Sequence, residues 1–189
     1  MTNIFQQVTT APITNDSSNR SAFAYQQVID EFEVNVHGRY RADQNLGTKC
    51  NIFVGDVMRA MGVPFPTKNE LPANDNDGGG DVTQGAARLH SWLNSVTGGQ
   101  RSGWTRIDTT TQVGMNTLMA HVRAGMPAVA STRDHIAVIR PDQDFESLTP
   151  SRLGELIIAQ AGAMNFQRGK LSLGWPKSRI SEIQFFIHA

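Results

Sequence analysis

The sequence predicts an α+β fold, because its first part carries helical spacing and its last third carries strand-like runs. Apolar residues recur every three or four positions from Ser21 to about Val36, and again after Cys50. Beyond Pro127, short apolar runs separated by turn residues predict strands of a small antiparallel sheet. Helices followed by strands are typical of the α+β class.

Helix boundaries follow from start and stop signals in the chain. Gly62, with Pro64 and Pro66 behind it, ends the helix that begins at Cys50, and Gly125 with Pro127 closes a later one. Cys50 therefore stands at or near a helix N-terminus. The expected helices cover about 21–36, 50–61, 83–96 and 112–123, and the expected strands cover 128–130, 135–139, 156–159 and 183–187.

The length of 189 residues and the 39% apolar content predict one domain. Residues 1–20 are polar and without period, so we expect a flexible leader followed by a single domain over residues 21–189. The segment 62–81 is rich in proline and glycine, and it predicts a surface loop of the kind that rims a binding site.

Charge and cysteine usage exclude several classes of partner. Seventeen basic residues balance seventeen acidic ones, which argues against nucleic acid or an anionic membrane as the partner. No run of about 18 apolar residues predicts a membrane span, and the N-terminus lacks the features of a secretory signal, so we expect synthesis in the cytoplasm. A single cysteine forms no internal disulfide, and we expect a monomer.

Cys50 is the candidate nucleophile, because a helix N-terminus and a nearby imidazolium both favour a thiolate. His135 opens the apolar run HIAVIRP, and Gln160 is the polar side chain in the run LIIAQAGAM. A histidine base needs a third group to orient it, and Gln160 can accept a hydrogen bond from the ring. The alternatives are an inert buried cysteine, a core histidine, and a glutamine amide bonded to backbone.

These three segments resemble one family of hydrolases. GTKCNIFVGDVMRAMGVPFP resembles the nucleophile helix of NlpC-type and CHAP-type peptidoglycan peptidases and amidases. DHIAVIRP is similar to their histidine strand, and IIAQAGA resembles the strand that carries their third polar residue. The resemblance covers about residues 40–187, and it implies a papain-like fold in which the nucleophile helix packs on the sheet.

The resemblance also implies roles for individual residues. Cys50 would be the nucleophile, His135 its base and Gln160 the residue that orients the base. Tyr40 resembles a tyrosine that lines the site in these families. The other candidates for substrate contact are Asn51 and Asp134, which flank the nucleophile and the base. No metal and no organic cofactor are implied.

The expected function is a cysteine hydrolase that cleaves amide bonds in the peptide stem or cross-link of bacterial peptidoglycan. The chain resembles type VI secretion amidase effectors, which implies action in the periplasm or wall of a target bacterium and an immunity protein as partner. A phage lysin, released by lysis, is similar. The alternatives are a non-catalytic binding module, and a cysteine protease or deamidase that acts on proteins.

Other polar clusters are weaker candidates. Asn74 to Asp81 resembles a calcium loop, but Ala86 stands where its bidentate glutamate belongs. The glycine clusters lack the lysine of a phosphate-binding loop. We therefore expect no ion or nucleotide at these positions, and we expect no catalytic role for His90, His121 or His188.

Overall fold

The computed structural model describes residues 14–18, 20–42, 47–66 and 84–189. In this part of the chain, six strands form one sheet: β1 (Trp104–Ile107), β2 (Ala128–Ser131), β3 (Ile136–Ile139), β4 (Ile157–Gln160), β5 (Phe166–Lys170) and β6 (Gln184–His188). The strands lie in the order β1-β6-β2-β3-β4-β5, and each neighbouring pair is antiparallel.

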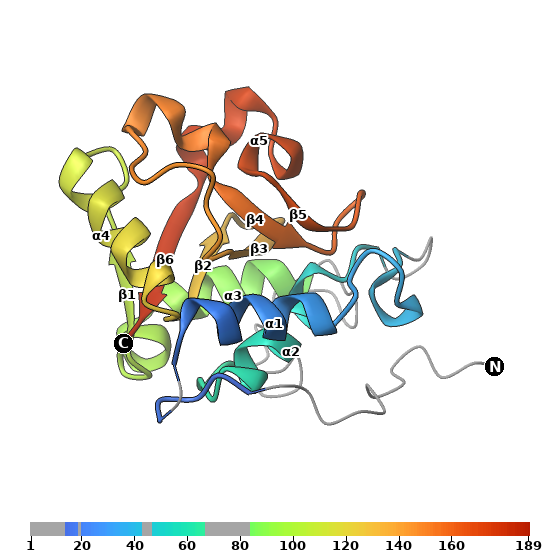
Figure 1. The fold of residues 1–189 in the computed structure, drawn as a ribbon. Coiled ribbons are helices and arrows are strands. Elements are labelled where there is room, and N and C mark those ends of the chain that lie inside the picture. The colour runs from blue at the N-terminus through green and yellow to red at the C-terminus, as the bar shows by residue number, and fades with distance from the viewer. Residues whose placement is uncertain (1–13, 19, 43–46, 67–83) are drawn as a thin grey trace.

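Helices cover both faces of this sheet (Figure 1). One face carries α1 (Ala22–Glu31), α2 (Cys50–Ala60) and α3 (Gln84–Asn94), and the other carries α4 (Gln112–Arg123) and α5 (Leu171–Gly174). The short helical turns are η1 (Gly38–Tyr40), η2 (Val96–Gln100), η3 (Pro150–Glu155) and η4 (Lys177–Glu182).

Two apolar cores, one on each face, explain the sequence of the central strands. Val129 and Val138 pack with α1, α2 and α3, whereas their neighbours Ala130 and Ile139 pack with α4. Because both faces are covered, β2, β3 and β4 are buried throughout and read as continuous apolar runs. The predicted α+β class with a small antiparallel sheet is confirmed.

Several expected boundaries and two strands differ from the prediction. The first helix ends at Glu31, short of 36, because Glu33 has a φ of 45° in the left-handed region. The helix expected over 83–96 covers Gln84–Asn94. Strands β1 and β5 were not predicted, since both lie at the sheet edges and carry exposed polar residues in place of an apolar run.

The last part of the predicted leader packs onto the domain. Asn15 is fully buried, and its amide donates to the carbonyl of Gly125 at 2.8 Å and accepts from the Ser21 N–H at 2.9 Å. Its backbone N–H also donates to the carbonyl of Ala60 at 3.1 Å. Asn15 is therefore anchored on the domain, while residues 1–13 and 19 of the predicted leader lie outside the described residues.

Candidate active site

Cys50 is the first residue of α2, as the sequence predicts, and its side chain is directed at the start of β3. The backbone N–H of Ile136 donates to the sulfur, and the hydroxyl of Thr48 lies 3.9 Å from it. The residue is only 2% exposed. The helix N-terminus and these donors together surround the sulfur with partial positive charge.

His135 brings its ring to Cys50 from the residue just before β3. The thiol and the imidazole are hydrogen-bonded, and the Nε2 atom of His135 lies 2.7 Å from the Oε1 atom of Gln160. Gln160 is the last residue of β4, the strand beside β3. The structure therefore brings together Cys50, His135 and Gln160, the three residues that the sequence proposes for catalysis.

The hydrogen bonds of Gln160 determine which ring nitrogen carries a proton. The amide nitrogen of Gln160 donates to the carbonyl of Met164 at 3.0 Å, so its Oε1 atom is the one that faces His135. An amide oxygen only accepts, and the Nε2 atom of His135 must therefore be protonated. This leaves Nδ1 as the ring nitrogen that exchanges a proton with Cys50.

Trp175 covers the histidine ring. The two ring centroids are 4.6 Å apart, and the indole Nε1 donates to the hydroxyl of Thr132 at 3.0 Å. Trp175 is 1% exposed, whereas His135 is only partly buried. The indole therefore shields one face of the ring from water and fixes its orientation. The sequence does not predict this contact, because Trp175 lies forty positions beyond His135 in the chain.

Electrostatics in the site favour a thiolate and an imidazolium. Burial raises the pKa of Cys50, but hydrogen bonds from His135, the Ile136 N–H and Thr48 outweigh it, and the pKa lies below the ordinary thiol value. Burial lowers the pKa of His135, but the hydrogen bonds to Cys50 and Gln160 outweigh it and raise the pKa above the ordinary value. The two groups titrate as a coupled pair.

We expect Cys50 to stay reactive toward iodoacetamide at a pH where an ordinary thiol does not. A thiol with a pKa of about 8.5 loses roughly 75-fold in thiolate between pH 8 and pH 6. The thiolate of Cys50 persists until the pH falls through its lowered pKa, so its alkylation rate should fall by less over this interval than that of an ordinary thiol. The ratio of the two rates is the measurement, since burial slows alkylation at both pH values.

Glycine at position 174 is required for the orientation of Gln160. A Cβ atom at this position would lie 2.4 Å from the Oε1 atom of Gln160, the atom that accepts from His135. In Gly174→Ala the amide must move away, which removes a hydrogen bond that raises the pKa of His135. We expect alkylation of Cys50 at pH 6 to slow by up to about tenfold, the effect of one pKa unit.

Gly38→Ala is the matched control, because a Cβ atom at Gly38 meets nothing within 4 Å. It should alkylate at the rate of the unmodified chain. Equal rates for Gly174→Ala and Gly38→Ala at pH 6 would show that Gln160 does not control the charge of His135.

Tyr40, predicted to line the site, is instead part of the core. It is 0% exposed, and its hydroxyl donates to Asp56 of α2 at 2.8 Å. Arg39 pairs with the same carboxylate at 2.7 Å, and the ring packs edge-on against Phe53. Tyr40 has no surface to offer a substrate, and its contacts fix the chain that precedes Cys50 onto the nucleophile helix.

Asn51 follows Cys50 in the chain, and Asp134 precedes His135. Asn51 is half-buried, and a Cβ atom at Gly85 would come within 2.4 Å of its amide nitrogen, so it packs on the start of α3. The Oδ1 atom of Asn51 is buried and has no hydrogen-bond partner among the described residues. Asp134 is exposed and pairs with Arg179 at 2.6 Å, which holds the pKa of its carboxyl below the usual range.

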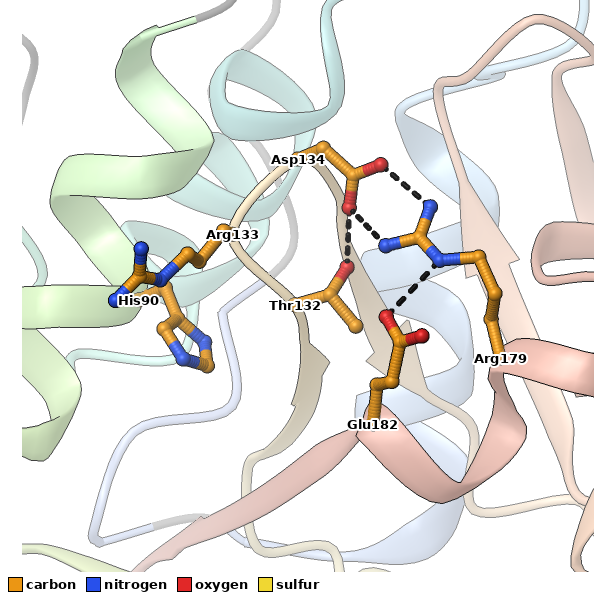
Figure 2. A pocket seen from close by; sticks show the side chains of 6 residues that line it. All are labelled: His90, Thr132, Arg133, Asp134, Arg179 and Glu182. Atoms are coloured by element: carbon orange, nitrogen blue, oxygen red, sulfur yellow. Dashed lines mark hydrogen bonds and ion pairs between the residues drawn. The ribbon is translucent and has the colours of Figure 1, made fainter.

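A pocket of about 310 Å³ lies beside the turn that carries His135 (Figure 2). Its lining is polar throughout: His90, Thr132, Arg133, Asp134, Arg179 and Glu182. Figure 2 shows His90 and Arg133 on one side of the β2–β3 turn and the Asp134, Arg179 and Glu182 side chains on the other. Apart from Asp134, these residues were not predicted, because α3, the turn and η4 meet only in the folded chain.

Some of the expectations concern residues outside the described ranges. The calcium-like segment 74–81 and most of the loop over 62–81 lie there. In the described ranges, no group of three or more His, Cys, Asp or Glu side chains is arranged to hold a metal ion. No helix within these ranges has both the length and the apolar character needed to cross a bilayer.

Comparisons with protein-family models, with curated proteins and with solved structures found no match for this chain.

Proposed function

We propose that this chain is a cysteine hydrolase of papain-like architecture that cleaves amide bonds in the peptide stem or cross-link of bacterial peptidoglycan. The observation that carries the proposal is the hydrogen-bonded series from the Cys50 thiol through His135 to Gln160, at the N-terminus of a buried helix. The resemblance of these same segments to peptidoglycan peptidases and amidases supports the substrate class.

The chemistry follows from the protonation states of the pair. The thiolate of Cys50 attacks the carbonyl carbon, and the backbone N–H of Cys50 at the helix N-terminus stabilises the oxyanion. The C–N bond breaks as His135 gives its Nδ1 proton to the leaving amine, which leaves a thioester on Cys50. His135 then takes a proton from water, whose oxygen attacks the thioester and releases a carboxylic acid, which restores the Cys50 thiolate beside a protonated His135.

The biological setting that fits this chemistry is delivery to another bacterium. A small hydrolase of this kind would act in the periplasm or wall of a target cell, after secretion or after lysis. The producing cell would then need an immunity protein, which we propose as the partner that blocks the site.

Digestion of purified sacculi tests the proposal. The full chain should release soluble muropeptides with new amino and carboxyl ends, and mass spectrometry of the products would identify the bond. Cys50→Ala should release none above background, because no other thiol exists in the chain. Equal product profiles from both proteins would contradict the proposal. Release of ammonia from protein substrates, with intact sacculi, would favour the deamidase alternative.

One observation favours the second candidate, a non-catalytic binding module. Cys50 is 2% exposed, and a substrate carbonyl needs direct access to the sulfur. A binding module would keep Cys50 as an inert core thiol. A fall of about 75-fold in the alkylation rate of the folded chain between pH 8 and pH 6, as for an ordinary thiol, together with inert sacculi, would support this candidate.

A further inference from the structure

The pocket beside His135 contains two arginines and two carboxylates, but both carboxylates pair with the same arginine. Arg179 is held at one side by both carboxylates of the pocket, Asp134 at 2.6 Å and Glu182 at 3.0 Å. These ion pairs are drawn in Figure 2. With one of the two arginines engaged in this way, the charge of Arg133 is left without a counterion in the pocket.

The side chain of Arg133 is accessible to a ligand. It is exposed, and no hydrogen bond or ion pair joins its guanidinium to another residue in the described part of the chain. Burial, followed by the charges of Arg133 and Arg106, holds the pKa of His90 below its ordinary value, so this neighbour is neutral at pH 7. The pocket therefore offers one guanidinium to an anion, and a carboxylate is its natural bidentate partner.

The pocket is rigidly connected to the catalytic histidine. The backbone N–H of Thr132 donates to the carbonyl of His135 at 2.8 Å, and the Thr132 hydroxyl donates to Asp134 at 2.9 Å. Trp175 contacts both Thr132 and the ring of His135. In the proposed reaction the leaving amine sits at His135, so the residue that carries this amine lies next to the β2–β3 turn.

We propose that this pocket binds a free carboxylate on the leaving-group side of the scissile amide, with Arg133 as the specificity-determining residue. The inference rests on the proposed function and names its substrate class. The preferred substrate has an amino-acid leaving group whose carboxyl is neither amidated nor cross-linked. Peptides with a carboxamide or a neutral side chain at this position should be poorer substrates.

The experiment uses two synthetic stem peptides that differ only in carboxylate or carboxamide on the residue that supplies the leaving amine. We expect the full chain to cleave the carboxylate peptide with a kcat/KM about tenfold higher, mainly through KM. Arg133→Gln should abolish this preference by weakening the carboxylate peptide alone, and Arg133→Lys should retain part of it. Arg101→Gln, at an exposed arginine outside the pocket, is the matched control.

The outcomes separate this inference from the proposed function. Cleavage of both peptides at equal kcat/KM, or an equal loss on both peptides in Arg133→Gln, would overturn the carboxylate pocket and leave the hydrolase in place. Failure to cleave either peptide, with no release from sacculi, would overturn the hydrolase and the inference together. Loss of the preference in Arg101→Gln would assign it to net charge and overturn the role of Arg133.

Discussion

Replacement of His135 by alanine is expected to lower the rate of muropeptide release by about 10³- to 10⁴-fold. In the proposed reaction, the imidazole stabilises the thiolate and also donates the proton without which the amine cannot leave. Both functions disappear with the ring. The measurement is the initial rate of release from purified sacculi, with the fold of each variant checked by circular dichroism.

His37→Asn is the matched control for this substitution. The Nδ1 atom of His37 accepts from the Arg39 N–H at 3.2 Å, an interaction that an asparagine oxygen can replace, and the residue lies outside the Cys50, His135 and Gln160 series. This variant should keep the full rate. Retention of more than about a tenth of the rate in His135→Ala would exclude His135 as the general acid.

The exposures of Cys50 and His135, the two proposed catalytic residues, bear on how a substrate would reach the thiol. Cys50 is almost fully buried, whereas His135 is partly exposed beside the β2–β3 turn. The polar pocket adjoins the same turn. We therefore expect the substrate to approach Cys50 past the histidine, with its leaving-group side toward Arg133. This direction of approach connects the proposed reaction with the proposed carboxylate preference.

The sequence predicts the parts of the site that depend on local structure. Cys50 falls at a helix start because a polar, glycine-containing loop precedes an apolar stripe of helical period. His135 and Gln160 could be placed at neighbouring strands because their runs are short, apolar and separated by turns. That the three side chains meet could be proposed only from the family resemblance.

The sequence cannot predict the parts that depend on long-range packing. Tyr40 has the hydroxyl of a substrate-binding residue, and only its ion-paired neighbour Asp56, sixteen positions away, shows that it is a core residue. Trp175 and Arg133 likewise acquire their roles from elements that are distant in the chain. Apolar periodicity reports which face of an element is buried, but not which partner covers it.

Arg140→Ala is expected to lower the free energy of unfolding by about 2 to 4 kcal/mol. Arg140 follows β3 and is 1% exposed, and its guanidinium donates to Asp30 of α1 and to Asp142, each at 2.6 Å. It also donates to the carbonyl of Gln167 in β5 at 2.7 Å. Its loss removes the ion pair between α1 and the sheet and one donor each from Asp30, Asp142 and the Gln167 carbonyl, although Arg168 still pairs with Asp142 and Gln167 still donates to the Asp30 carbonyl. Urea unfolding followed by circular dichroism measures the change.

An exposed ion pair provides the comparison that isolates burial as the cause. Arg152 pairs with Glu155 on the surface and lies over the ring of Phe145. Arg152→Ala should therefore lower the free energy of unfolding by no more than about 1 kcal/mol. Similar decreases in the free energy of unfolding of the two variants would mean that the buried position of Arg140 does not increase its contribution to stability. A double-mutant cycle of Arg140→Ala with Asp30→Ala then gives the coupling energy of the pair itself. A coupling near zero would assign the stabilisation to Asp142 and the Gln167 carbonyl, and would remove the ion pair as the link between α1 and the strand that follows His135.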